Sequence, residues 1–261
     1  VLGGLLSFRQ DFNWTVFLLA LLTTIFLQIL SNLANDYGDF KKGTDNEERV
    51  GPERAMQSGA ISEKQMKIAL IINIVLCFST GVPLVLMAFH GVSYLTIIFL
   101  LLGVLGIVAA IKYTVGKKAF GYSGLGDIFV FVFFGLVSVM GTYYLLNEVL
   151  PLDILLPAIA IGALSTAVLN LNNLRAHVND KASNKNTVVV KLGFEKAKIY
   201  HYVLLIIPFV CASLFSIVTE NVYVLISWVV MPVVVVHLKK VARTKIPKHL
   251  DPELKKIALS T

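Results

Sequence analysis

The feature that most constrains this chain is a series of seven long apolar segments with almost no charged residues. The segments are 14–34, 68–89, 94–111, 127–147, 152–172, 199–219 and 222–238. A helix of about 20 apolar residues spans the hydrocarbon core of a bilayer. Only 15% of the 261 residues are charged, whereas a soluble domain carries about 25%. The sequence therefore predicts an all-α, polytopic membrane helical bundle.

Both ends of the chain predict parts of further spans. Residues 1–6 are apolar and lack the charged region and cleavage site of a signal peptide. Residues 254–261 resemble the beginning of another span. We therefore expect about nine transmembrane helices, the two terminal ones being incomplete in this chain. Cys77 and Cys211 lie within apolar segments, so neither a disulfide framework nor a thiol metal site is expected.

The basic residues are distributed asymmetrically along the chain. Loops 35–67, 112–126, 173–198 and 239–256 follow every second span, and together they hold 22 of the 23 Lys and Arg residues. Arg9 is on the opposite side in this interpretation. Loops rich in Lys and Arg face the cytoplasm, so we expect the chemistry on that side. Because the net charge of +7 follows membrane topology, it does not indicate nucleic-acid binding.

Two of the basic loops share a polar pattern, which we interpret as an internal repeat of about 1–125 and 126–261. The corresponding positions are Asn35, Asp39 and Gly43 in the first copy and Asn172, Ala176 and Asp180 in the second. Each copy has lost one carboxylate. Four spans separate the copies, so both loops emerge on the same membrane face and the duplication is parallel. This arrangement predicts a single transmembrane domain in which the two motifs face one cavity.

The carboxylates of these motifs require a counter-charge. A spacing of three residues places Asp36 and Asp39 on one side of a helix end. With Asp45 nearby and Asp180 in the second copy, the carboxylates would repel one another without a cation. Hard oxygen ligands suit Mg²⁺, which shares its remaining positions with water and substrate phosphates. The interleaved Lys and Arg residues indicate a phosphate-bearing ligand. For Glu63 we expect an ordinary ion pair of a solvated loop.

At these residues the sequence resembles the UbiA superfamily of intramembrane aromatic prenyltransferases. Its two aspartate-rich motifs are similar to Asn35-Asp36-x-x-Asp39, followed by Asp45, and to Arg175-Ala176-x-x-x-Asp180. Within the superfamily the chain is most similar to the branch of 1,4-dihydroxy-2-naphthoate polyprenyltransferases of menaquinone biosynthesis. The residues that carry this similarity include Gly124-Leu125-Gly126-Asp127, Gly141-Thr142-Tyr143-Tyr144 and Asn172-Asn173-Leu174-Arg175.

The resemblance implies a bundle around a central cavity and Mg²⁺-dependent transfer of a polyprenyl group from its diphosphate to a small aromatic acid. Decarboxylation would then give demethylmenaquinone, and the enzyme would lie in the bacterial cytoplasmic membrane with its site facing the cytoplasm. The implied catalytic residues are Asp39, Asp180 and Arg175. The implied metal ligands are Asn35, Asp36, Asp39, Asp45 and Asp180. The implied substrate-binding residues are Arg54, Tyr113, Lys117, Lys118, Tyr122, Asn172, Asn173 and Lys181.

Several alternatives stay open at this point. Lys117 and Lys118 are also typical of a membrane edge that sets topology, and Tyr113 and Tyr122 of interfacial anchors. The acceptor could instead be 4-hydroxybenzoate, homogentisate, chlorophyllide or haem. A cation-coupled transporter is a candidate of a different class. Ala176 stands where the superfamily has Asp, which predicts impaired turnover. The histidines, including His201 and His237, show no spacing typical of shared ligands.

Overall fold

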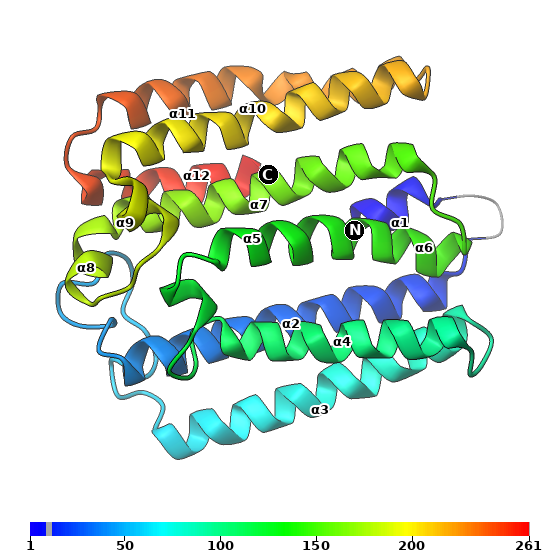
Figure 1. The fold of residues 1–261 in the computed structure, drawn as a ribbon, viewed down its shortest axis with the longest axis horizontal. Coiled ribbons are helices and arrows are strands. Elements are labelled where there is room, and N and C mark those ends of the chain that lie inside the picture. Colours follow the sequence, from blue (N-terminus) through cyan, green and yellow to red (C-terminus); the bar gives the residue numbers. More distant parts are fainter. Residues whose placement is uncertain (9–11, 261) are drawn as a thin grey trace. The chain divides into compact units, whose positions relative to one another are not determined.

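A computed structural model of the chain describes residues 1–8 and 12–260, so Arg9 lies outside the described residues. The described residues form helices and no strands (Figure 1). In chain order they are α1 (Leu2–Leu6), α2 (Trp14–Lys41), α3 (Glu63–Ala88), α4 (Tyr94–Lys112), η1 (Phe120–Tyr122), α5 (Gly126–Val130), η2 (Phe131–Met140), α6 (Gly141–Asn147), η3 (Leu152–Ile154), α7 (Leu155–Arg175), α8 (His177–Ala182), α9 (Val188–Leu192), α10 (Phe194–Val218), η4 (Val222–Val230), α11 (Met231–Arg243), η5 (Pro247–Leu250) and α12 (Asp251–Ser260). The segment η2 is π-helical.

Seven helical stretches of the described chain have the length and apolarity to cross a bilayer. They are Trp14–Lys41, Glu63–Ala88, Tyr94–Lys112, Gly126–Asn147, Leu152–Arg175, Phe194–Val218 and Val222–Arg243. They coincide with the seven predicted apolar segments, which confirms the all-α membrane bundle. The protein is therefore a multi-pass membrane protein. The short helices α1 and α12 lie where the sequence predicts parts of two further spans.

Local signals fix the beginnings of the long helices. The Asn13 side chain accepts a hydrogen bond from the Val16 N–H at the start of α2. Ser62 and Gln65 form a capping box at the start of α3, in which each side chain accepts from the other residue's N–H. The sequence placed the end of the first span at residue 34, but α2 continues to Lys41. The first acidic motif therefore lies on a helix rather than in a loop.

The chain divides into two compact units, which are described separately. Unit 1 consists of Val1–Glu47, Glu53–Phe120 and Gly141–Leu150, and unit 2 of Glu48–Pro52, Gly121–Met140 and Pro151–Thr261. In unit 1, α2, α3 and α4 run side by side (Figure 1). Leu30, Cys77 and Ile107 are buried among them. The hydroxyls of Thr23 and Thr80 form a hydrogen bond of 3.0 Å between α2 and α3.

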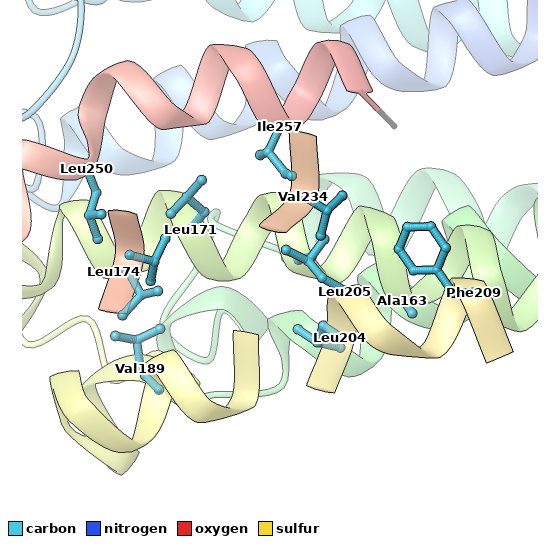
Figure 2. Close-up of a cluster of buried hydrophobic side chains, with 13 residues drawn as sticks. Ala163, Leu171, Leu174, Val189, Leu204, Leu205, Phe209, Val234, Leu250 and Ile257 are labelled. Carbon is cyan, nitrogen blue, oxygen red and sulfur yellow. The ribbon is translucent and has the colours of Figure 1, made fainter. Parts of the chain in front are cut away.

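In unit 2, α7 is the central helix and contacts η2, α10 and α12. Figure 2 shows the apolar cluster that α7 shares with its neighbours. Leu171 and Leu174 come from α7, Leu205 from α10, Val234 from α11 and Ile257 from α12, and all are buried. Lipid tails are as apolar as these side chains, so close packing rather than burial from water has to stabilise such contacts.

The close approach of η2 to α7 depends on two glycines. A Cβ added at Gly135 would lie 2.6 Å from the carbonyl oxygen of Ala158. A Cβ added at Gly162 would lie 2.9 Å from the ring and the carbonyl oxygen of Phe131. Small residues at helix interfaces allow this kind of backbone contact in membrane proteins. A larger side chain at either position would force the two segments apart.

We expect Gly135→Ala to destabilise the folded protein by about 1–3 kcal/mol, because the added methyl group overpacks a backbone contact. Thermal unfolding of the purified protein in detergent measures this change. Gly103→Ala in α4 is the matched control, since no atom lies within 4 Å of a Cβ at Gly103. Equal unfolding temperatures for the two variants would contradict the proposed packing.

A buried chain of polar side chains connects α10, α11 and α12. Nε2 of His201 lies 2.9 Å from Nε2 of His237, whose Nδ1 lies 2.9 Å from a carboxylate oxygen of Glu253. All three residues are at most 3% exposed. If His237 donates from Nδ1 to the carboxylate, its Nε2 accepts from His201. The prediction that the histidines lack a shared-ligand spacing did not concern hydrogen bonds, and no sequence pattern indicated this chain of contacts.

Glu253 also forms ion pairs with Lys240 and Lys256, at 3.0 and 2.9 Å. Burial alone would raise the pKa of Glu253, but hydrogen bonds from Lys256, His237 and Lys240 lower it to about 2. The folded protein therefore holds this carboxylate ionised at pH values where the unfolded chain protonates it. Its stabilising contribution is present above pH 4.5 and is lost as the pH falls toward 2.

Glu253→Gln should therefore reduce the acid sensitivity of the protein. We expect the unfolding temperature of the unchanged protein in detergent to fall more steeply between about pH 5 and 3 than that of the variant. Glu47→Gln, which changes an exposed acid, should retain the steep dependence. Parallel curves of unfolding temperature against pH for the unchanged protein and Glu253→Gln would show that Glu253 does not contribute to the acid sensitivity.

Candidate functional site

The first acidic motif lies on the last two turns of α2, in unit 1. Asp36 and Asp39 are 7% and 6% exposed, and their spacing places both on one side of the helix. The C-terminal end of a helix carries a partial negative charge. Two nearly buried carboxylates at such an end form a strongly electronegative position. This environment favours the binding of a cation.

A tight turn after α2 adds a third carboxylate to the motif. Gly43 has a φ of +69°, in the left-handed region that favours glycine. The next N–H, that of Thr44, donates to the carbonyl oxygen of Asp39 at 3.0 Å. Beyond this turn, a carboxylate oxygen of Asp45 lies 3.8 Å from Nε of Arg54. The structure thus brings the predicted ligand Asp45 together with the predicted diphosphate-binding Arg54.

The oxygens of the motif fit a hard cation. Within the described residues, Oδ1 of Asn35 and Oδ1 of Asp36 are buried and accept no hydrogen bond. A buried polar atom without a partner costs about 1–3 kcal/mol, and coordination of Mg²⁺ would offset that cost. In residues 1–8 and 12–260, no three His, Cys, Asp or Glu side chains form a group that could hold a metal ion by themselves. The oxygen donors of the motif are of the type that suits Mg²⁺, which keeps several water and phosphate ligands.

The segment after α4 is held closely against α2. The Thr114 hydroxyl donates to the carbonyl oxygen of Ala34 at 2.8 Å. A Cβ added at Gly38 would lie 2.7 Å from the Thr114 side chain, so the approach requires glycine. Beside this contact lies a groove of about 370 Å³. Its lining residues are Tyr37, Gly38, Lys41, Lys42, Thr114, Val115, Gly116 and Lys117.

The predicted residues of unit 1 are distributed between this groove and the acidic motif. Lys117 lines the groove, whereas Lys118 is exposed and Tyr113 is half-buried, and neither is part of the lining that the described residues form. Asp36 and Asp39 are likewise outside that lining. The structure therefore groups Lys117 with the lysines of α2 rather than with the carboxylates.

Glu63 forms the ordinary ion pairs predicted for it. Its carboxylate lies 2.7 Å from Nζ of Lys41 and 2.8 Å from Nζ of Lys67. These pairs are at the exposed start of α3, where they contribute little to stability. They also partly neutralise Lys41, one of the lysines that line the neighbouring groove.

The second motif begins at the end of α7, in unit 2. Arg175 is 9% exposed, and its Nε and Nη2 donate to Oδ1 of Asn172 at 3.2 and 2.7 Å. Its Nη1 donates to the carboxylate of Asp251, the first residue of α12. The structure thus brings the predicted pair Arg175 and Asn172 together. Asp251 was not predicted, because 76 residues separate it from Arg175 and no pattern relates them.

Ala176 lies at the break between α7 and α8. Its carbonyl oxygen accepts from the N–H of Asp180 at 2.8 Å, and the carbonyl of Asp180 accepts from the N–H of Lys185 at 2.8 Å. Asp180 is 3% exposed, and the neighbouring Lys181 is exposed. The break therefore directs one acid inward and one base outward within a single turn. A carboxylate at position 176 would begin this turn.

Amide side chains on the last turns of α7 are deeply buried. Asn170 and Asn173 are 0% and 4% exposed. Among the described residues, neither amide atom of Asn170 has a hydrogen-bond partner. Buried polar groups in a bundle are normally paired. The burial of Asn170 and its lack of a partner make it a further candidate of the second motif.

The predicted Tyr122 lies beside the loop that follows the second motif. Its carbonyl oxygen accepts from the N–H of Asn186 at 3.3 Å, and Nζ of Lys185 lies 5.2 Å from the centre of its ring. Nζ of Lys191 donates to the carbonyl oxygen of Ser123 at 2.6 Å. These contacts within unit 2 connect the end of loop 112–126 to the segment between α8 and α10.

Asp127 is a buried acid without a predicted role. It lies at the start of α5, is 6% exposed and accepts a hydrogen bond from Tyr200 of α10. Within the described chain its Oδ2 has no partner. The signal that could have identified it is its position in the Gly-Leu-Gly-Asp tract, where a carboxylate opens an otherwise apolar span.

His177, the first residue of α8, is half-buried and lies against Phe194, with 6.1 Å between ring centres. Burial lowers the pKa of His177, and the nearby cation of Lys181 lowers it further. The imidazole is therefore neutral at neutral pH. It adds no positive charge beside Asp180.

Comparison with known sequences gives a consistent result along nearly the whole chain. Residues 1–257 match the family described as the UbiA prenyltransferase family. The 1,4-dihydroxy-2-naphthoate octaprenyltransferase of Haemophilus influenzae is 46% identical, over 96% of this chain and 81% of that protein. The protein of the same name from Escherichia coli is also 46% identical, over 98% of this chain and 83% of that protein.

Comparison with solved structures identifies the same architecture. A UbiA homologue from Archaeoglobus fulgidus, solved with GPP and Mg²⁺, matches 99% of this chain and 89% of that chain with a TM-score of 0.66. The sequence identity is 15%, so this similarity concerns the fold. The same homologue solved with DMAPP and Mg²⁺ matches with a TM-score of 0.64.

Proposed function

Because this chain belongs to the UbiA prenyltransferase family, we propose that it transfers a polyprenyl group from polyprenyl diphosphate to 1,4-dihydroxy-2-naphthoate. The observation that carries this proposal is the 46% identity, along nearly the whole chain, to two enzymes named for that reaction. Transfer with loss of CO₂ and diphosphate would give demethylmenaquinone. Bacterial relatives and the basic loops support a location in the bacterial inner membrane, with the motifs on the cytoplasmic side.

We assign metal binding to the oxygens of the two acidic motifs. In the first motif, Asn35 and Asp36 contribute buried oxygens without hydrogen-bond partners, and Asp39 and Asp45 add carboxylates. In the second, Asp180 contributes its carboxylate. When bound, Mg²⁺ would supply positive charge that stabilises the departing diphosphate. The tight turn at Gly43 keeps the first set of oxygens together.

In this proposal basic side chains bind the diphosphate. Their exposure and their existing ion pairs indicate which of them contacts it first. Lys117 and Lys181 are exposed at the ends of spans and present full charges. Arg175 and Arg54 are already paired with Asp251 and Asp45. We therefore assign the first contact with diphosphate to the two lysines. The paired arginines hold the motifs in position.

The prenyl chain and the reaction both require an apolar environment. Heterolysis of an allylic carbon–oxygen bond leaves a cation that water would capture, so the acceptor has to meet it in a water-excluded space. We propose that the two sequence repeats form one transmembrane domain and that the acidic motif of each repeat takes part in the reaction. The prenyl tail then lies along the apolar spans.

Membranes that contain the protein should convert labelled polyprenyl diphosphate and 1,4-dihydroxy-2-naphthoate to a labelled, decarboxylated product. Parallel reactions with 4-hydroxybenzoate, homogentisate, chlorophyllide and haem test the other acceptors. If only one of these other acceptors yields a labelled product, that acceptor is the substrate instead of 1,4-dihydroxy-2-naphthoate. Cation-driven uptake into proteoliposomes without any covalent product would instead support a transporter.

We expect Asp39→Asn and Asp180→Asn each to lower prenyl transfer by at least about tenfold, because each removes a carboxylate ligand or partner of the metal. The Mg²⁺ concentration for half-maximal rate should rise in parallel. Glu47→Gln changes an exposed acid of the segment that follows α2 and should leave both values unchanged. If the two motifs bind one diphosphate, the double variant should lose less than the product of the two single effects. Strict multiplicativity would argue for independent sites.

Ala176→Asp should raise turnover. The substitution returns a carboxylate to the start of the turn that holds Asp180, and a lost metal partner of this kind costs about 10–100-fold. The rate of prenyl transfer at saturating Mg²⁺ measures the gain. Ala176→Asn is the control, because asparagine has nearly the shape of aspartate but carries no charge. Equal rates for all three proteins would show that position 176 does not limit the reaction.

A further inference from the structure

A second concave surface lies at the end of α11, within unit 2 and separate in sequence from both acidic motifs. It is a groove of about 720 Å³, here called the α11 groove. Its basic lining residues are Lys239, Lys240, Arg243, Lys245 and His249. Four permanent cations in one groove repel one another, so the groove is electrostatically complementary to an anion.

The neighbouring acids neutralise only part of the charge of this groove. Between residues 222 and 260 the sequence has two acidic residues, Asp251 and Glu253. Asp251 pairs with Arg175 of α7. Glu253 is 2% exposed and binds His237 and two lysines, so both carboxylates already have basic partners within unit 2. Neither acid lines the groove.

Within the groove, Lys240 is partly compensated by Glu253, whose carboxylate lies 3.0 Å from its Nζ. Lys239, Arg243 and Lys245 are exposed and provide the remaining charge. Their side chains combine long apolar stems with charged ends, which suits a boundary between hydrocarbon and water.

The position of the groove indicates what kind of anion it meets. The apolar span Val222–Arg243 ends at the groove. The end of a membrane span is expected near the phosphate groups of a bilayer leaflet. Val236 and Ile246 give the groove apolar walls, and both are exposed. A phosphate with attached acyl chains satisfies the basic and the apolar walls together, whereas a free phosphate satisfies the basic residues alone. Clusters of Lys and Arg at the end of a transmembrane helix bind anionic lipids.

We propose that the α11 groove binds the headgroup of an anionic phospholipid, with the phosphate between Lys239 and Arg243 and the acyl chains along Val236. The site is independent of the proposed prenyl transfer, because none of its residues belongs to the acidic motifs. A lipid bound there would hold the end of α11 at the membrane surface.

Native mass spectrometry of the full chain, released from mixed micelles, tests the proposal. The probe is phosphatidylglycerol, with phosphatidylcholine as the zwitterionic comparison. The unchanged protein should retain phosphatidylglycerol preferentially. The double variant Lys239→Gln/Arg243→Gln should bind it roughly 25-fold more weakly, since each cation near a membrane surface contributes roughly fivefold. The control Lys64→Gln/Lys196→Gln removes the same charge from two exposed lysines elsewhere and should bind as the unchanged protein does.

The other outcomes would overturn the proposal. Equal retention of the two lipids by the unchanged protein would exclude a headgroup site. Equal loss of phosphatidylglycerol binding in both double variants would show that the effect comes from the net charge of the protein and not from the groove. Displacement of phosphatidylglycerol by inorganic diphosphate at stoichiometric concentration would assign the groove to a free anion. Lys245→Gln, on the other side of the groove, gives an independent variant, and unfolding temperatures verify that each protein is folded.

Discussion

Helices in a bilayer gain nothing from burying apolar surface against one another, because the lipid is equally apolar. Close backbone packing and buried polar contacts must therefore decide how this protein folds. In unit 2, Gly135 and Gly162 let η2 approach α7 to a distance that no other residue pair would allow. In unit 1, Gly38 and Thr114 do the same between α2 and the segment after α4. Both glycine contacts lie on the helices that carry an acidic motif or pack against one.

Much of the fold could be predicted from the sequence because bilayer thickness sets a length that apolar segments must meet. All seven predicted spans are present. The end of α2 could not be placed correctly, since the polar residues from Asn35 to Lys41 are compatible with both a loop and a helix. The π-helical segment η2 was also unforeseen, because its sequence is as apolar as an ordinary span. Hydropathy identifies a span without specifying its backbone geometry.

In the candidate functional site, too, local patterns could be predicted from the sequence and contacts between distant residues could not. Asp36 and Asp39 could be proposed because their spacing within a turn is a local pattern, and Asp180 because it lies in the second copy of the repeated pattern; their roles stay predictions. The contact of Arg175 with Asp251, and the chain from His201 through His237 to Glu253, join residues that are far apart in the sequence. No local pattern encodes such contacts, since they arise only when α7, α10, α11 and α12 pack. These contacts nevertheless determine which charged side chains remain available to bind a ligand.

The pairing of Arg175 with Asp251 has an evolutionary consequence. One partner ends the helix of the second motif, and the other begins the last described helix of the chain. A change of charge at either position leaves the other side chain without its counter-ion. Across homologues the two positions should therefore be exchanged together, and chimaeras that join the C-terminal helix of one homologue to the body of another should function only when both halves carry a compatible pair.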